Sequence, residues 1–140
     1  MSERIEVPGR PILAFVYDRC STSNTAALDA RIERCRRYAV EHGWVLVGVW
    51  VDRGDRALCD DVRPEWRRMA GAMRQAATPP VCLVDTWDRI SRDRAGGVAL
   101  RLIVHQAGGY CVTTEGEDDA DRGHGHPPAA IAPLSLRGRP

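Results

Sequence analysis

Residues 12–17 read ILAFVY, a continuous apolar run between Pro11 and Asp18. Such a run places apolar side chains on both faces of an extended strand, which is typical of a strand buried inside a parallel sheet. Three further short runs of the same kind follow at residues 44–51, 81–84 and 110–113. The sequence therefore predicts four strands that are covered on both faces.

The segments between these runs have helical periodicity. The first apolar stripe comprises Leu28, Ile32, Cys35 and Ala39. A second follows Pro64, a residue suited to the first turn of a helix, and comprises Trp66, Met69, Ala70, Met73 and Ala77. The third comprises Ala95, Val98, Ala99, Leu102 and Ile103. Strands that alternate with such helices predict an α/β fold, in which three layers, α/β/α, enclose a mostly parallel central sheet.

The composition excludes several classes of function. The chain has 140 residues, enough for one domain with an ordinary core, and a net charge of only +1. All 20 basic residues are arginine, which argues against a P-loop or a phosphoacceptor receiver site, because each relies on a lysine. The arginine bias fits either codon usage or phosphate recognition. No apolar run approaches the roughly 20 residues of a membrane helix, and we expect no contact with a membrane.

The cysteines indicate a reducing compartment. There are five, an odd number, without a Cys-x-x-Cys pair. Cys20, Cys82 and Cys111 lie in or beside apolar runs, so we interpret them as small buried apolar residues. The N-terminus does not resemble a signal peptide, and we expect a cytoplasmic protein.

The predicted domain spans residues 11–117. Residues 1–10 form an N-terminal extension, and residues 118–140 are expected to be a disordered tail, because Gly, Pro, Asp and His replace the periodic pattern. The acidic residues at the junction are predicted to be a solvated, self-repelling stretch, comprising Glu115, Glu117, Asp118, Asp119 and Asp121.

Polar residues follow each predicted strand, and in open α/β sheets ligands bind at this edge. The first strand delivers Arg19 and Ser21, and the third delivers Arg89 and Arg92. A serine hydroxyl needs help to act as a nucleophile, and fixed guanidinium groups can stabilise the charge that develops on a phosphate. No metal-ligand set is evident, so this pattern favours arginine-assisted phosphoryl transfer; the alternative is that these arginines are ordinary solvated charges.

Five motifs, in order, resemble the serine recombinase (resolvase/invertase) family over about residues 11–117. Residues 17–22, YDRCST, are similar to its Tyr-x-Arg-Val-Ser-Thr motif, and residues 28–44 to its first helix and the exit from that helix. Asp52-x-Gly54 and Arg63-Pro64 match its motifs before the second helix, and residues 87–93, WDRISRD, resemble its Leu-Asp-Arg-Leu-Ser-Arg-Asp signature. The resemblance implies a resolvase-like fold and DNA as the partner.

The resemblance also implies roles for individual residues. Ser21 would attack the scissile DNA phosphate, form a 5′-phosphoserine link and release a 3′-hydroxyl, with no metal or other cofactor. The other catalytic residues would be Arg19, Arg89, Arg92 and Asp88, and the residues that bind DNA phosphate would be Arg63, Tyr17 and Thr22. Asp88 would orient arginines or handle the proton of the leaving group.

The sequence departs from the family pattern in three respects. Thr25 and Arg31 stand where the family usually has glutamines, and acids between Asp55 and Asp61 replace its Ser-Gly. The third is an expectation: because the sequence ends where the family begins its long oligomerisation helix, we expect a stand-alone catalytic domain without its own DNA-binding domain. We therefore keep two hypotheses: a strand-transfer enzyme, as a homo-oligomer or beside a full-length recombinase, or a non-catalytic protein of the same fold that binds such a partner or DNA phosphate.

Overall fold

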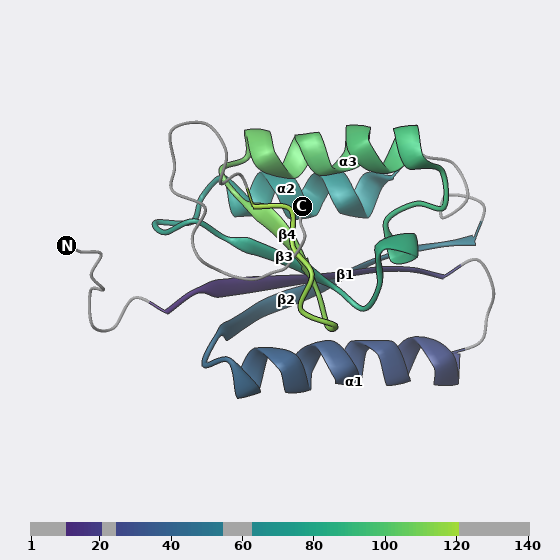
Figure 1. Cartoon of the computed structure of the whole chain (residues 1–140), viewed down its shortest axis with the longest axis horizontal. Coiled ribbons are helices and arrows are strands. Elements are labelled where there is room, and N and C mark those ends of the chain that lie inside the picture. The colour runs from purple at the N-terminus through teal and green to yellow at the C-terminus, as the bar shows by residue number, and fades with distance from the viewer. Residues whose placement is uncertain (1–10, 21–24, 55–62, 121–140) are drawn as a thin grey trace.

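A parallel four-stranded sheet forms the centre of the protein, which a computed structural model describes for residues 11–20, 25–54 and 63–120 (Figure 1). The strands are β1 (Leu13–Cys20), β2 (Val45–Arg53), β3 (Val81–Val84) and β4 (Tyr110–Thr113), in the order β2-β1-β3-β4. The helices are α1 (Thr25–Glu41), α2 (Pro64–Met73) and α3 (Arg94–Gln106), with a short 3-10 helix, η2 (Trp87–Arg89), after β3. This confirms the α/β prediction with its parallel sheet.

The helices lie on both faces of the sheet, with α1 on one face and α2 and α3 on the other (Figure 1). One apolar cluster packs α2 and α3 on the sheet and includes Phe15, Trp66, Met69 and Val104. The second lies between the sheet and α1 and includes Val16, Cys35, Ala39 and Leu83. Helices thus cover each face of the sheet, which fits the buried apolar residues of β1, β3 and β4. The prediction of a strand covered on both faces is wrong for β2, because β2 lies at the edge of the sheet and its Val45 and Val47 are 46 % and 47 % exposed.

The helix predictions are confirmed in two cases and corrected in the third. Leu28, Cys35 and Ala39 of α1 are buried, as are Trp66, Met69, Ala70 and Met73 of α2. Ala77 of the predicted second stripe is exposed and lies outside the helix, because α2 already ends at Met73. In α3 the buried residues are Leu100 and Val104, whereas Val98 and Leu102 of the predicted stripe are 52 % and 53 % exposed. Apolar residues surround much of this helix, so the period alone could not select the face that packs.

β1 is longer than the apolar run that predicted it. It continues through Asp18, Arg19 and Cys20, all of which are buried. The reason is its partner, because β2 pairs with β1 to the end, with Arg19 opposite Asp52 and Cys20 opposite Arg53. Asp18 and Arg19, which were expected to follow the strand, therefore lie within it.

α2 begins at Pro64, as predicted, and Asp52 of β2 caps it. The Asp52 carboxylate accepts hydrogen bonds from the backbone N–H groups of Glu65 at 3.1 Å and Trp66 at 3.3 Å. These are donors that a helix leaves unpaired in its first turn. The cap ties the start of α2 to the end of β2, beside the site described below.

The chain turns back after β4. Gly116 has a φ of 89°, and Asp119 donates its backbone N–H to the Cys111 carbonyl at 3.1 Å. The Asp119 carboxylate accepts from Cys111 N and lies 3.4 Å from Arg101 and 3.2 Å from His105. Asp119 is therefore held in the fold, unlike the solvated acid predicted there, because α3 places the basic side chains of Arg101 and His105 beside it, and both are distant from Asp119 in the sequence.

The prediction for the cysteines is confirmed. Cys20, Cys82 and Cys111 are buried, as predicted, and so is Cys35. No helix in the part of the chain that the structure describes has the length and apolar character needed to cross a membrane.

Candidate active site

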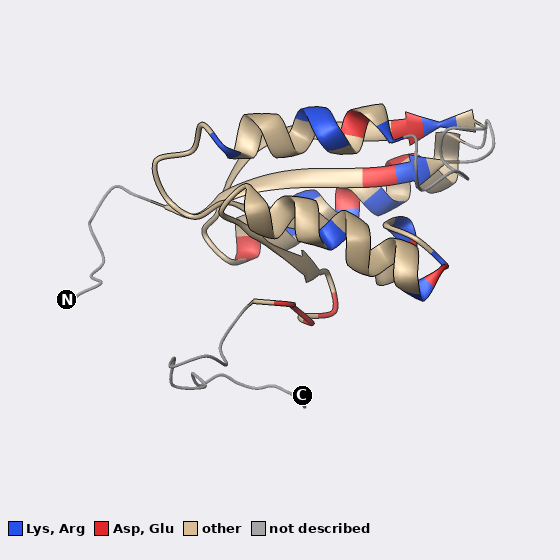
Figure 2. Ribbon diagram, turned by 90° about the horizontal axis from the view of Figure 1, so that it is seen from above, with Lys and Arg blue, Asp and Glu red and all other residues tan. Residues whose placement is uncertain are grey.

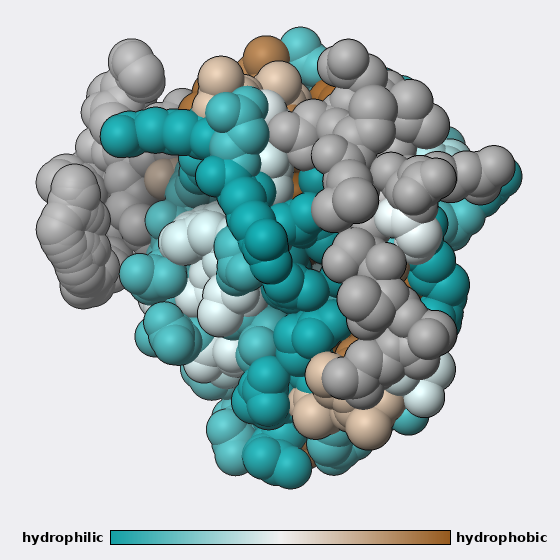
Figure 3. Space-filling model, turned by 90° about the vertical axis from the view of Figure 1, so that its right-hand side faces the viewer, coloured by the Kyte–Doolittle hydropathy of each residue, from teal (hydrophilic) through white to brown (hydrophobic). Residues whose placement is uncertain are grey.

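Charged residues gather at the carboxyl ends of the strands. Figure 2 shows acidic and basic positions at the ends of β1 and β2. Figure 3 looks onto this end of the molecule, where the described surface is mostly hydrophilic. Because the strands are parallel, residues from several parts of the sequence meet at this one edge.

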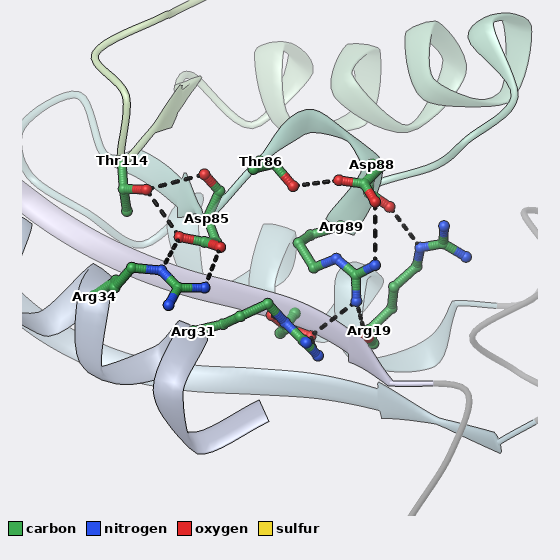
Figure 4. A network of polar contacts seen from close by, with 9 residues as sticks. Arg19, Arg31, Arg34, Asp85, Thr86, Asp88, Arg89 and Thr114 are labelled. Atoms are coloured by element: carbon green, nitrogen blue, oxygen red, sulfur yellow. Dashed lines mark hydrogen bonds and ion pairs between the residues drawn. The ribbon is translucent and has the colours of Figure 1, made fainter. Parts of the chain in front are cut away.

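Arg19 joins the end of β1 to η2 (Figure 4). It is almost fully buried, and its Nε donates a hydrogen bond of 2.8 Å to the backbone carbonyl of Asp88. In return, Nη1 of Arg89 donates one of 2.9 Å to the backbone carbonyl of Arg19. These reciprocal bonds hold the two arginines side by side.

The side chain of Asp88 contacts the Arg89 guanidinium. Its Oδ2 accepts a hydrogen bond of 3.2 Å from Arg89 Nη2, and its Oδ1 accepts one from the Thr86 hydroxyl. Burial by itself raises the pKa of Asp88, but the hydrogen bonds from Thr86 and Arg89 outweigh it and lower the pKa below its usual value. Asp88 is therefore ionised near neutral pH and acts as an acceptor for arginine.

Arg63 and Tyr17 lie in the interior behind this edge. Arg63 Nη1 donates a hydrogen bond of 3.0 Å to the Tyr17 hydroxyl, which donates one of 2.8 Å to Asp52. Burial raises the pKa of Tyr17 well above its usual value, and the neighbouring Asp52 adds to the increase against the opposing charge of Arg63. Tyr17 thus stays protonated and links Arg63 to the acid that caps α2.

Four guanidinium groups share this end of the sheet. Burial lowers the pKa of Arg19, and the positive charges of Arg63, Arg89 and Arg92 lower it further, against the attraction of Asp88. Burial is the larger cause of this shift, and the part that comes from the neighbouring arginines is a repulsion that a bound anion would relieve. The arrangement therefore suits an oxyanion such as phosphate.

Two of the predicted site residues, Ser21 and Thr22, lie outside the described residues. In sequence Ser21 directly follows Cys20, the last residue of β1. The structure brings Arg19, Asp88 and Arg89 into contact. Arg92 is exposed and near enough for its charge to act on Arg19, and Arg63 and Tyr17 lie in the interior behind this group. Within residues 11–20, 25–54 and 63–120 no group of three His, Cys, Asp or Glu side chains could hold a metal ion.

The family model described as the N-terminal domain of resolvases matches residues 14–126. The chain belongs to the resolvase family. The chain has no match among curated proteins. Solved structures with a similar fold include catalytic domains of an integrase and of an IS607-like serine recombinase.

Three of these structures are similar over about three quarters of the chain. The N-terminal catalytic domain of TP901-1 integrase is 23 % identical with a TM-score of 0.62, over 76 % of this chain and 80 % of that one. A resolvase-family site-specific recombinase from Streptococcus pneumoniae has the same identity and TM-score, over 76 % and 75 %. The C-terminal catalytic domain of ISC1926 TnpA, an IS607-like serine recombinase, is 22 % identical with a TM-score of 0.60, over 73 % and 69 %. At these identities the likeness shows the fold.

Sequence reasoning missed two ion pairs that fasten α1 of this resolvase-family domain to the sheet edge (Figure 4). Arg31 donates two hydrogen bonds to Asp18, at 2.8 and 2.9 Å. Arg34 donates two to Asp85, at 2.9 and 2.8 Å, and the Thr114 hydroxyl lies 2.9 Å from the same carboxylate. Both arginine–carboxylate pairs are bidentate, the strongest geometry for such a contact.

A signal for the first pair does exist in the sequence. Arg31 lies three residues after Leu28 and four before Cys35, so it shares the helix face that packs on the sheet. A cation on a buried helix face requires an acid opposite it. The hydrogen bond to Asp18 raises the pKa of Arg31, against the effect of burial, so this cation remains charged.

Proposed function

We propose that this domain cleaves and rejoins DNA strands through a covalent link between Ser21 and a 5′-phosphate. The observation that carries the proposal is the convergence of Arg19, Arg89 and Arg92 at the end of β1, next in sequence to Ser21. Family membership supports the same chemistry.

In this proposal the arginines bind and stabilise the phosphate. Ser21 Oγ loses its proton and attacks phosphorus, the P–O3′ bond breaks, and the 3′-oxygen takes up a proton and leaves as a hydroxyl. Arg89 is held by the Arg19 carbonyl and Asp88, so its guanidinium is oriented before DNA arrives. The energy of the broken ester is kept in the phosphoserine ester, and the reverse attack by a 3′-hydroxyl rejoins the strand.

Tyr17, Arg63 and Asp88 act as supports in this scheme. Tyr17 holds Arg63, whose positive charge reaches Arg19. Asp88 is ionised, so its first role is to orient Arg89; accepting a proton from the serine would be a second. We place Thr22 beside the phosphate only by its position in the family motif, and we assign the protein to the cytoplasm, where its buried thiols fit a reducing compartment.

The test is covalent capture of DNA. The full chain is mixed with a nicked duplex or a half-site, the reaction is stopped with denaturant, and the peptide that carries a 5′-phosphoryl nucleotide is identified by mass spectrometry. We expect the adduct on Ser21, none with Ser21→Ala, and a loss of about 100-fold or more with Arg89→Ala, the size of effect seen when one such electrostatic contact is removed.

Arg74→Ala is the matched control, since Arg74 is an exposed arginine at the other end of α2 from Arg63. It should form the adduct at the wild-type rate. An adduct on a residue other than Ser21, or equal loss with Arg74→Ala and Arg89→Ala, would contradict the proposal.

A second candidate is a non-catalytic protein that binds DNA phosphate or a full-length recombinase. The observation in its favour is the number of acids among the arginines, because Asp18 and Asp88 both approach Arg89 and would compete with phosphate. DNA binding that depends on Arg89 but yields no adduct, alone or with a full-length recombinase, would favour this candidate.

A further inference from the structure

One buried carboxylate faces two arginines at the edge of the candidate site. Asp18 is 2 % exposed, and its Oδ1 lies 3.8 Å from Arg89 Nη1. Both of its oxygens nevertheless accept hydrogen bonds from Arg31, at 2.8 and 2.9 Å. The acid is thus adjacent to Arg89 but hydrogen-bonded to Arg31.

This division of partners matters because Arg89 is the arginine proposed to contact phosphate. A buried carboxylate without a partner is strongly unfavourable, so Asp18 must take a cation from its surroundings. Without Arg31 the nearest candidate is Arg89, which would need to move by about 1 Å to reach ordinary hydrogen-bond distance. An arginine paired in this way would be a poorer ligand for phosphate.

We propose that Arg31 is a positioning residue that occupies Asp18 and thereby leaves the Arg89 guanidinium available for phosphate. The inference rests on the phosphate site of the proposed function. Arg31 acts through Asp18, and it makes no contact with the phosphate itself.

The alternative is that the pair only fastens α1 to the sheet, and the chain contains a matched control for that role. Arg34 and Asp85 form a second bidentate pair one turn further along α1. Asp85 is buried like Asp18, but its other partner is Thr114 rather than an arginine of the cluster. Breaking either pair loosens the same helix, and only the Arg31 pair adjoins Arg89.

The experiment measures phosphate binding at Arg89 in the full chain labelled with ¹⁵N-arginine. Inorganic phosphate is added, and the Nε–Hε signal of Arg89, assigned by its loss in Arg89→Lys, reports the affinity. We expect Arg31→Gln to weaken phosphate binding by about tenfold or more, which corresponds to the free energy that one charge-assisted hydrogen bond contributes. Arg34→Gln should bind phosphate as the wild type does.

The decisive variant is the double change Asp18→Asn with Arg31→Gln. It removes both charges, so no buried ion is left unpaired, and it should restore phosphate affinity to within about threefold of the wild type. An anchoring role alone predicts no such rescue at Arg89. A wild-type affinity in Arg31→Gln, a double variant as weak as Arg31→Gln, an equal loss in Arg34→Gln, or no response of Arg89 to phosphate would each overturn the proposal.

Covalent capture of DNA is scored separately on the same proteins. If the phosphate titrations follow the expected order while no adduct forms, strand transfer fails as the function and the role of Arg31 stands. If the wild type forms the Ser21 adduct and Arg31→Gln forms it equally fast, the function stands and the role of Arg31 fails.

Discussion

The Tyr17 hydroxyl shows how a single atom supports the site from inside the core. It accepts from Arg63 and donates to Asp52, and all three residues are buried. We expect Tyr17→Phe to lower the free energy of unfolding by about 1–3 kcal/mol, because two buried polar groups lose a partner. Urea denaturation measures this loss. Tyr38→Phe is the control, since Tyr38 is half-buried and contacts His42 and Trp44 through its ring; an equal loss in both variants would show that the link is unimportant.

Asp85 makes stability sensitive to acid. The hydrogen bond from Arg34 lowers the pKa of Asp85 from its usual value, against the effect of burial, and Thr114 adds to the lowering. A carboxyl with a lowered folded-state pKa contributes stability above its unfolded pKa and loses it as the pH falls through the folded value. Between about pH 5 and pH 2, the wild type should therefore lose more stability than Asp85→Asn.

Glu33→Gln is the control for this measurement, because Glu33 is exposed and lies 4.0 Å from Arg37 on the same helix. Its loss of stability on acidification should match that of the wild type. If Asp85→Asn lost as much stability on acidification as the wild type, the ion pair with Arg34 would contribute nothing to the acid sensitivity.

At the scale of elements, α3 shows that periodicity identifies a helix without identifying its buried face. Leu100 is 2 % exposed and Leu102 is 53 % exposed. We expect Leu100→Ala to cost about 2–5 kcal/mol of stability, the usual cost of a core cavity, and Leu102→Ala to change it by less than about 0.5 kcal/mol. Thermal or urea unfolding of the two variants tests this, and each variant is the control for the other. If Leu102→Ala cost more stability than Leu100→Ala, the face predicted from the sequence would be the buried one.

The turn after β4 is the second element whose contacts decide its role. Asp119 accepts from Cys111 N and faces Arg101 and His105 of α3. We expect a chain that ends at Ala120 to keep the melting temperature of the full chain. A chain that ends at Glu115 should melt at least about 4 °C lower, because several hydrogen bonds are lost. Equal melting temperatures for the two truncations would contradict this.

For the whole molecule, charge limits the interaction with DNA. The net charge is only +1, so affinity for DNA depends on the local arginine cluster. The chain alone should bind duplex DNA with a Kd on the order of 10⁻⁴–10⁻⁶ M and without sequence preference. Arg89→Ala should weaken binding to the same extent for two unrelated duplexes, and so should Arg92→Ala. Each change should also reduce, by about one, the slope of the logarithm of the binding constant against the logarithm of the salt concentration. The measurement is a titration of DNA binding with salt, and Arg74→Ala is the control. Sequence-selective binding by the chain alone would contradict the prediction.

The sequence by itself determined the succession of strands and helices along the chain, the packing stripe of α1 and that of α2 as far as Met73. It also determined the motif that places Arg19 at the end of the first strand. Each of these depends on residues close together in the chain, where spacing is a direct record of the local structure.

Tertiary structure alone decided the length of β1, the buried face of α3 and the partners of Arg31 and Asp119. Asp18, Arg19 and Cys20 belong to β1 because β2 pairs with them, and Arg31 can be a partly buried cation because Asp18 lies opposite it. The physical reason is the same in each case. A polar group in the interior is stable only with its partner, and these partners come from elements that are distant in the sequence.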